Sequence, residues 1–414
     1  MSAKKTKTLL LASIAIFLAI SLMLFPKESL EASVRGMNIW WNVVFPSLLP
    51  FFIVSELLIS FGVVTLIGTL LEPLMRPLFR VPGVGGFVWA MGLASGNPAG
   101  AKLTARLRLE NKLTQIEAER LVSFTSSSNP LFIFGAVAVG FFHNPALGIL
   151  LACAHYGANL FVGLIMRFYM EKENRQAQKE LELTRQDDKS GPKWLTVLYE
   201  EHQKDGRSLG KVLGDAVQSS VQTLLIVGGF IILFSVINKV LTLVHFVDLV
   251  GYVIGLLLVM LHLPVELGQP IISGLFEMTL GAQRVSETTQ SNLLQQVIAV
   301  SFLLGFSGFS IQAQVASLLA ETDIRFKPFI IGRVLQGLFA AGLVIVLFQP
   351  LYIERKPIVF FETVIPVFNQ IDKVQTTWGQ FLQISPYITL TMLIIATFIW
   401  TYRQLNKSTK KSYR

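Results

Sequence analysis

The chain has 414 residues, of which 52% are hydrophobic and only 15% are charged, and its formal net charge is +9. This composition indicates an integral membrane protein and argues against a soluble domain. The basic residues occur in short segments between apolar runs, without interleaved aromatic residues. They therefore indicate orientation in a membrane, and nucleic acid is not an expected partner.

The N-terminal part predicts an anchor and one further crossing. Residues 1–36 form the predicted membrane anchor helix, in which the apolar stretch Leu9–Phe25 follows three lysines. A cleaved signal peptide is the alternative, but no small-x-small cleavage site follows, so a retained helix is favoured. Trp40–Phe61 predicts a second span, kinked by its prolines. Val63–Phe79 is interrupted by charges and prolines, and we expect it to lie along the membrane interface.

The next stretch contains two interruptions of helical sequence. The apolar run Gly83–Ala94 is too short to span a bilayer, because its 12 residues rise about 18 Å as a helix against about 30 Å of hydrocarbon. Asn97 and Pro98 then suit the N-cap and first position of a new helix, and the same pair recurs at Asn129 and Pro130. Two helix starts inside apolar sequence predict broken helices that offer unpaired backbone N–H groups to a ligand.

The rest of the chain alternates apolar spans with polar connections. Residues 171–215 are densely charged and predict a cytoplasmic linker, and residues 352–385 predict an extracytoplasmic loop. Residues 386–414 predict a last membrane helix and a basic tail. Whether Phe246–Leu263 spans the membrane or lies along it stays open at this point. The other predicted crossings are Leu121–Phe142, Pro145–Phe168, Val221–Val244, Leu293–Leu319 and Pro328–Leu351.

Two parts of the chain, residues 37–170 and 216–351, resemble each other and indicate a diverged duplication. Gly92–Ala101 can be laid over Gly274–Gln283, and later matches keep nearly the same offset. The positive-inside rule favours cytoplasmic N- and C-termini, with the second half entering the membrane in the opposite sense. We therefore expect an all-α polytopic protein of the cell membrane. Its two inverted repeats would bring broken or re-entrant helices together near the midplane, as in secondary transporters.

The residues around the first interruption also resemble a known family. Gly92–Lys102, Glu117–Leu121 and Phe124–Ile133 are similar to segments of the nucleoside-recognition, or Gate-domain, membrane proteins, with support from Ala154–Tyr156 and Gly332–Gly337. Within that family the chain looks most like a branch that serves endospore formation. The resemblance implies Gate-like repeats in both halves and a membrane protein needed for spore cortex formation. It does not imply which solute is recognised.

Four polar side chains beside the two helix starts are the first candidates to bind a polar solute: Ser95, Asn97, Ser127 and Asn129. The alternative is that the two asparagines only cap their helices, which buried N–H groups in lipid require in any case.

The second half offers four further candidates: Glu277, Thr279, Ser307 and Ser310. A carboxylate at membrane depth is costly, so Glu277 is a candidate proton- or cation-coupling group. Nearer the interface, Glu277 would instead be solvated or paired with Arg284. Ser307 and Ser310 are the counterparts of the first-half serines, with interhelical hydrogen bonding as the alternative role.

The sequence predicts neither an enzyme nor a metal or cofactor site. It contains no H-E-x-x-H motif, no Walker phosphate loop and no C-x-x-C. His155 is expected to be a packing residue, because no other ligand falls at metal-binding spacing. Arg333 is expected to snorkel or to pair with an acid.

Two functions remain in view. The favoured one is a transporter-like protein that moves or senses a small polar solute during sporulation, with the lipid bilayer as its other partner. The alternative is a non-transporting scaffold that recruits spore-envelope partners through residues 171–208 and 352–385. The solute, the coupling ion and a homo-oligomeric state are left open by the sequence.

Overall fold

The computed structural model describes residues 3–171, 173 and 206–354. The chain divides into two units, and every described residue lies in the first, Met1–Lys356. Most of the predicted linker 171–215, most of the loop 352–385 and the whole segment 386–414 lie outside the described residues.

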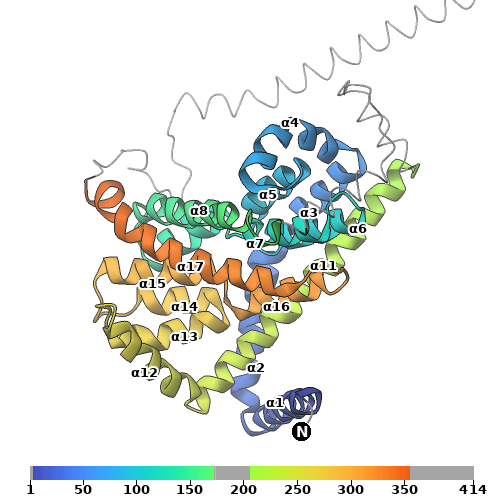
Figure 1. Cartoon of the computed structure of the whole chain (residues 1–414). Helices are drawn as coiled ribbons and strands as arrows, with labels where there is room; N and C mark the ends of the chain where they lie inside the picture. The colour runs from blue at the N-terminus through green and yellow to red at the C-terminus, as the bar shows by residue number, and fades with distance from the viewer. Residues whose placement is uncertain (1–2, 172, 174–205, 355–414) are drawn as a thin grey trace, which may run out of the picture. The chain divides into compact units, whose positions relative to one another are not determined.

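The predicted anchor of residues 1–36 is divided into two helices. Helix α1 (Ala3–Leu24) ends before Phe25, which is not helical, and Pro26 opens α2 (Pro26–Ile39) at a bend of 105°. A π-helical turn η1 (Trp40–Val44) joins α2 to α3 (Phe45–Ser60). Helix α2 packs along the later helix α11, so the anchor belongs to the packed body of the protein (Figure 1).

The first half consists of α4 (Val63–Phe79), α5 (Val84–Ser95), α6 (Ala99–Leu109), α7 (Gln115–Thr125), the π-helical η2 (Leu131–Phe141) and α8 (Leu147–Met166). Within the predicted crossing Leu121–Phe142, the helix start predicted after Asn129 and Pro130 is confirmed. The helix stops after Thr125 and restarts at Leu131, because Ser126 has extended backbone angles and residues 126–129 form no helical turn.

The second half has the same order of elements. It consists of α11 (Leu209–Leu243), α12 (Phe246–Val259), the 3-10 turn η3 (Val265–Leu267), α13 (Gly268–Phe276), α14 (Met278–Ser286), α15 (Leu293–Phe306), α16 (Gly308–Leu319), α17 (Phe326–Phe348) and the π-helical η4 (Gln349–Ile353). Helix α11 begins at Leu209, so the end of the predicted linker is helical. Helix α12 has 14 residues and rises about 21 Å, too short to cross a bilayer upright.

Four of the described helical segments are long and apolar enough to cross a membrane: Leu147–Met166, Leu209–Leu243, Leu293–Leu319 and Phe326–Ile353. The number rises to six if each of two sharply bent pairs, α1 with α2 and α3 with α4, forms one span. The chain is therefore an all-α, multi-pass membrane protein. The predicted crossings Pro145–Phe168, Val221–Val244, Leu293–Leu319 and Pro328–Leu351 fall on these four segments.

Glycine contacts reveal that the two halves are built alike. A Cβ added to Gly83, before α5, would lie 1.8 Å from the carbonyl oxygen of Gly68 in α4. A Cβ added to Gly268, at the start of α13, would lie 1.9 Å from the carbonyl oxygen of Gly251 in α12. Each half therefore needs a glycine where its re-entrant helix crosses the preceding helix closely.

Helix capping repeats in the same way. Thr114 and Glu117 form a capping box at the start of α7, and Asn292 and Gln295 form one at the start of α15. Both boxes sit 178 positions apart along the chain, close to the offset of the predicted duplication.

Of the four buried apolar clusters among the described residues, the two largest lie around Phe79, Leu121 and Phe124 and around Leu147, Val300 and Leu303. Helix α17 packs against both α8 and α15 and so connects the two halves (Figure 1). Many large apolar side chains elsewhere are exposed, as expected of helices that face lipid.

Candidate functional site

In the first half, two interruptions of helix lie against each other. Gly96 follows α5 with φ at 86°, and its Cα lies so close to Asn129 that an added Cβ would be 3.1 Å from the Asn129 nitrogen. The Asn129 side chain donates to the carbonyl oxygen of Ser95 at 3.1 Å and accepts from the N–H of Phe132 at 2.8 Å. Asn129 thus caps η2 and ties the two interruptions together, which confirms its predicted capping role.

Asn97 behaves differently from Asn129. The helix that follows it, α6, starts at Ala99 with Pro98 as its N-cap, and no side-chain cap is present. Both polar atoms of the Asn97 amide are buried and have no hydrogen-bond partner in the described part of the chain. The predicted capping by Asn97 is therefore wrong, because Pro98 has non-helical backbone angles, whereas Pro130 after Asn129 is already helical.

The second half repeats the arrangement with different residues. Glu277 separates α13 from α14, and its carboxylate accepts from the N–H groups of Thr279 at 3.1 Å and Leu280 at 2.7 Å. Gly308, with φ at 69°, starts α16 directly against this interruption, near the carbonyl oxygen of Gly274. The N–H groups at the start of α14 are thus occupied by the protein's own carboxylate, contrary to the expectation that they are unpaired.

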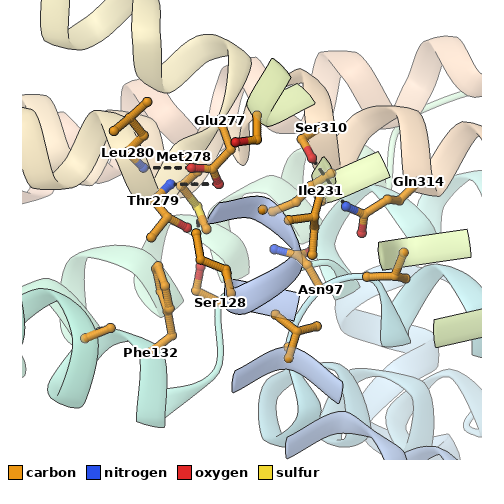
Figure 2. Close-up of a pocket in the computed structure, with 18 of the residues that line it drawn as sticks. Asn97, Ser128, Phe132, Ile231, Glu277, Met278, Thr279, Leu280, Ser310 and Gln314 are labelled. Carbon is orange, nitrogen blue, oxygen red and sulfur yellow. Dashed lines mark hydrogen bonds between the residues drawn. The ribbon is translucent and has the colours of Figure 1, made fainter. Parts of the chain in front are cut away.

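The interruptions of both halves meet at one cavity of about 420 Å³ (Figure 2). Ser128 from the first half approaches Met278 from the second, with 3.9 Å between the Ser128 hydroxyl and the Met278 sulfur. Figure 2 shows Asn97, Glu277 and Gln314 around the same space. The volume is that of a small-molecule site rather than of a single water.

Six of the eight predicted site residues line this cavity: Ser95, Asn97, Asn129, Glu277, Thr279 and Ser310. Ser127 and Ser307 do not line it. The hydroxyl of Ser127 donates to the carbonyl oxygen of Gly92 at 3.4 Å, and that of Ser307 to Leu304 at 3.3 Å. In a non-helical segment, a shift of one residue turns the side chain away, so the spacing alone did not separate Ser127 from Ser128.

Several lining residues come from helices that the sequence reasoning did not connect with the site. Asn238 on α11 is 1% exposed, donates to the carbonyl oxygen of Ser273 at 3.2 Å, and has a buried side-chain oxygen with no partner among the described residues. An asparagine inside an apolar span is a signal that could have found it. The other missed polar lining residues are Arg35, Ser128, Ser235, Lys239, Gln283, Arg284 and Gln314.

A buried polar network holds the segment 126–128 from behind. Arg333 on α17 is fully buried and donates to the carbonyl oxygens of Ser126 and Ser123. His155 on α8 accepts from the Ser128 N–H at 3.0 Å. The prediction that Arg333 snorkels or pairs with an acid is wrong, since backbone carbonyl groups freed by the missing helical turn accept its hydrogen bonds instead.

At one end of the molecule, charged loops join the halves. Arg108 donates twice to the Asp323 carboxylate, at 2.8 Å each, and Arg325 donates twice to Glu119, at 2.7 and 2.9 Å. The Arg108 hydrogen bonds hold the pKa of the Asp323 carboxyl below its ordinary value. Within the described residues, no three His, Cys, Asp or Glu side chains are grouped to hold a metal ion.

Comparison with known proteins places these features in context. The Gate family model, described as nucleoside recognition, matches residues 41–145 and 224–323, one match in each half. The sporulation integral membrane protein YlbJ of Bacillus subtilis (strain 168) is 55% identical over 415 residues, which cover 99% of this chain and 100% of that protein. A solved structure of CNTnw in an outward-facing state is similar at a TM-score of 0.40 and 13% identity, over 84% of this chain and 86% of that one.

Proposed function

Because the chain belongs to the family of Gate-domain membrane proteins that includes YlbJ, we propose that it acts in sporulation by moving or sensing a small polar solute. The solute occupies the cavity between the interrupted helices of the two halves. A family member 55% identical over its full length and named for sporulation supports the biological role. The chemistry of the cavity supports the solute.

One observation carries the solute part of the proposal. Ser95, Asn97 and Asn238 each place buried polar atoms at the cavity without a partner in the described residues. A buried polar atom without a hydrogen bond costs about 1–3 kcal/mol, so such atoms call for an occupant that bonds them. A solute with hydroxyl, amide or carbonyl groups matches these donors and acceptors.

The arrangement also supports a transport cycle. The cavity lies where the first-half interruption meets the second-half interruption, so movement of one half against the other changes its walls. Interrupted helices at a repeat interface are the usual binding site of transporters built in this way. Glu277 then serves to fix the start of α14, and its role as a coupling group stays a prediction.

The proposal is tested in a Bacillus subtilis strain that lacks YlbJ and carries this chain or a variant. Asn97→Ala removes both unpartnered amide atoms, and it does not remove a helix cap because Asn97 does not cap α6. We expect about tenfold weaker solute binding, and fewer heat-resistant spores, at an unchanged protein level in the membrane. Metabolite profiles of cells with and without the protein identify the solute as the compound whose distribution changes.

Thr69→Ala is the matched control, because the Thr69 hydroxyl is exposed and bonds only to the carbonyl oxygen of Thr65 in its own helix. It should behave as the unmodified chain. Full complementation by Asn97→Ala, together with an unchanged metabolite profile, would contradict the proposal. The alternative scaffold would act through residues 171–208 and 352–385, which lie almost wholly outside the described residues.

A further inference from the structure

The walls of the cavity carry an excess of positive charge. Among the described lining residues, the basic ones are Arg35, Lys239 and Arg284, and the acidic one is Glu277, so the formal sum is +2. The two oxygens of Glu277 already accept N–H groups of α14. No carboxylate of the described residues forms an ion pair with any of the three basic side chains.

Helix packing places the three basic residues on the walls of the cavity. Gly36, next to Arg35, lies so close to α11 that a Cβ there would be 3.0 Å from the Ile232 Cα. The Ser235 hydroxyl, one turn before Lys239, donates to the carbonyl oxygen of Ala32 at 2.7 Å. Because Ala32 lies opposite Ser235 and Gly36 opposite Ile232, the two helices run antiparallel, and Lys239 lies about 10 Å along α11 from the point opposite Arg35. Arg35 and Lys239 thus both lie along the contact between α2 and α11.

Arg284 is connected to α11 through Ser273. Its guanidinium donates to the Ser273 hydroxyl at 2.7 Å, and the Asn238 amide donates to the carbonyl oxygen of the same residue at 3.2 Å. Asn238 directly precedes Lys239 in α11. Arg284 also borders a second cavity lined by Asp248, Glu266 and Glu287, none of which forms an ion pair with it.

The three cations stand apart from the interrupted helices. Arg284 is seven residues after Glu277, which is about 10 Å along α14. The Asn97 amide thus lies at the first-half interruption, whereas the Asn238 amide lies among the cations. Arg35 is exposed and Lys239 and Arg284 are half-buried, so water screens their charges only in part, and the excess of cations attracts an anionic group.

We infer that the solute carries a negatively charged group, a phosphate or carboxylate, which Arg35, Lys239 and Arg284 bind while the amides of Asn97 and Asn238 hold its uncharged part. Arg35 lies outside both segments matched by the family model, so helix α2 contributes a specificity-determining residue. The inference rests on the proposed function and specifies the class of its solute.

The test uses the full chain in nanodiscs of phosphatidylcholine, with inorganic phosphate and glutamate as the two anion probes. Thermal unfolding is followed with each probe and with chloride at matched ionic strength. We expect phosphate or glutamate to raise the unfolding temperature above that in chloride. Arg35→Gln, Lys239→Gln and Arg284→Gln should each weaken the apparent affinity about tenfold.

Two matched controls remove the same charge from the same helices. Lys27→Gln in α2 and Lys211→Gln in α11 alter exposed lysines that do not line the cavity, and they should retain the response. Equal unfolding temperatures in all three salts, or a response that survives the triple glutamine variant, would overturn the inference.

A second arm separates a soluble anion from a lipid headgroup. In discs that contain phosphatidylglycerol, the response to the soluble probes should persist, and its disappearance would assign the site to lipid and overturn the inference. Complementation and metabolite profiling test the proposed function independently of the anion inference. If the solute found by metabolite profiling is uncharged and Arg35→Gln complements fully while Asn97→Ala does not, the anion inference fails and the proposed function stands.

Discussion

Two asparagines of similar sequence context have different roles in this protein. The Asn129 side chain forms hydrogen bonds with Phe132 and Ser95, so it stabilises the interruption. Asn97 makes no such bond in the described residues, so its amide is available to a solute. At this scale the two asparagines differ in the proline that follows, which is helical after Asn129 and non-helical after Asn97.

Asp323 provides a residue-scale prediction about pH. Arg108 lowers the pKa of this carboxyl from its ordinary value of 3.8, so their ion pair stabilises the folded state above that value. The contribution is lost as the pH falls through the lowered pKa of the folded state. Because the Asp323 side chain is 49% exposed, we expect Asp323→Asn to cost on the order of 0.5 kcal/mol at neutral pH.

Unfolding temperatures measured from neutral pH to well below 3.8 check this prediction. The difference between Asp323→Asn and the unmodified chain should shrink to nothing in acid. Glu321→Gln, in the same loop, is the control and should show little difference at any pH. A difference for Asp323→Asn that is as large in acid as at neutral pH would show that the ion pair is not its cause.

At the scale of elements, each half consists of a helix, a re-entrant pair and a second interrupted helix. The close crossings at Gly83 and Gly268 are equivalent, since an added Cβ would overlap a carbonyl oxygen in both. Such a crossing sets how deep the re-entrant helix lies, and therefore where its interruption meets the cavity.

This equivalence predicts that Gly83→Ala and Gly268→Ala destabilise the protein to a similar extent, by on the order of 1–3 kcal/mol each, through overpacking. Gly214→Ala in α11 is the control, because its Cβ would meet nothing within 4 Å and alanine favours the helix. The measurement is the fraction of protein that stays monodisperse after heating in detergent. A large loss in one half with none in the other would argue against equivalent crossings.

The sequence predicted the elements better than the site. Short apolar runs followed by glycine and proline located the first pair of interruptions, because these residues act locally. Three of the cavity-lining residues, Ser95, Asn97 and Asn129, followed from proximity to those interruptions, and three, Glu277, Thr279 and Ser310, from the matching segments of the second half. Arg35 and Asn238 could not be found that way, since only the packing of α2 against α11 brings them to the cavity. The complete burial of Arg333 was missed because the carbonyl groups that it bonds become available only where helix α7 stops.

At the scale of the whole molecule, contacts at several places among the described residues hold the two halves together. Arg108 and Arg325 join the charged loops, α17 packs against helices of both halves, and Ser128 meets Met278 at the cavity. The Arg108–Asp323 pair is partly exposed, whereas the Glu119 carboxylate that binds Arg325 is fully buried, so the first pair is the one suited to break and reform when the halves move.

The proposed transport cycle depends on opposite insertion of the two halves in the membrane. Lys112, between α6 and α7, and Gln290, between α14 and α15, are equivalent positions 178 residues apart. Each is changed to cysteine in a chain whose Cys153 is alanine, and intact cells are treated with a membrane-impermeant thiol reagent. We predict that Gln290→Cys reacts in intact cells and Lys112→Cys reacts only after lysis. Labelling of both positions from the same side of the membrane would contradict the inverted repeat and the transport cycle built on it.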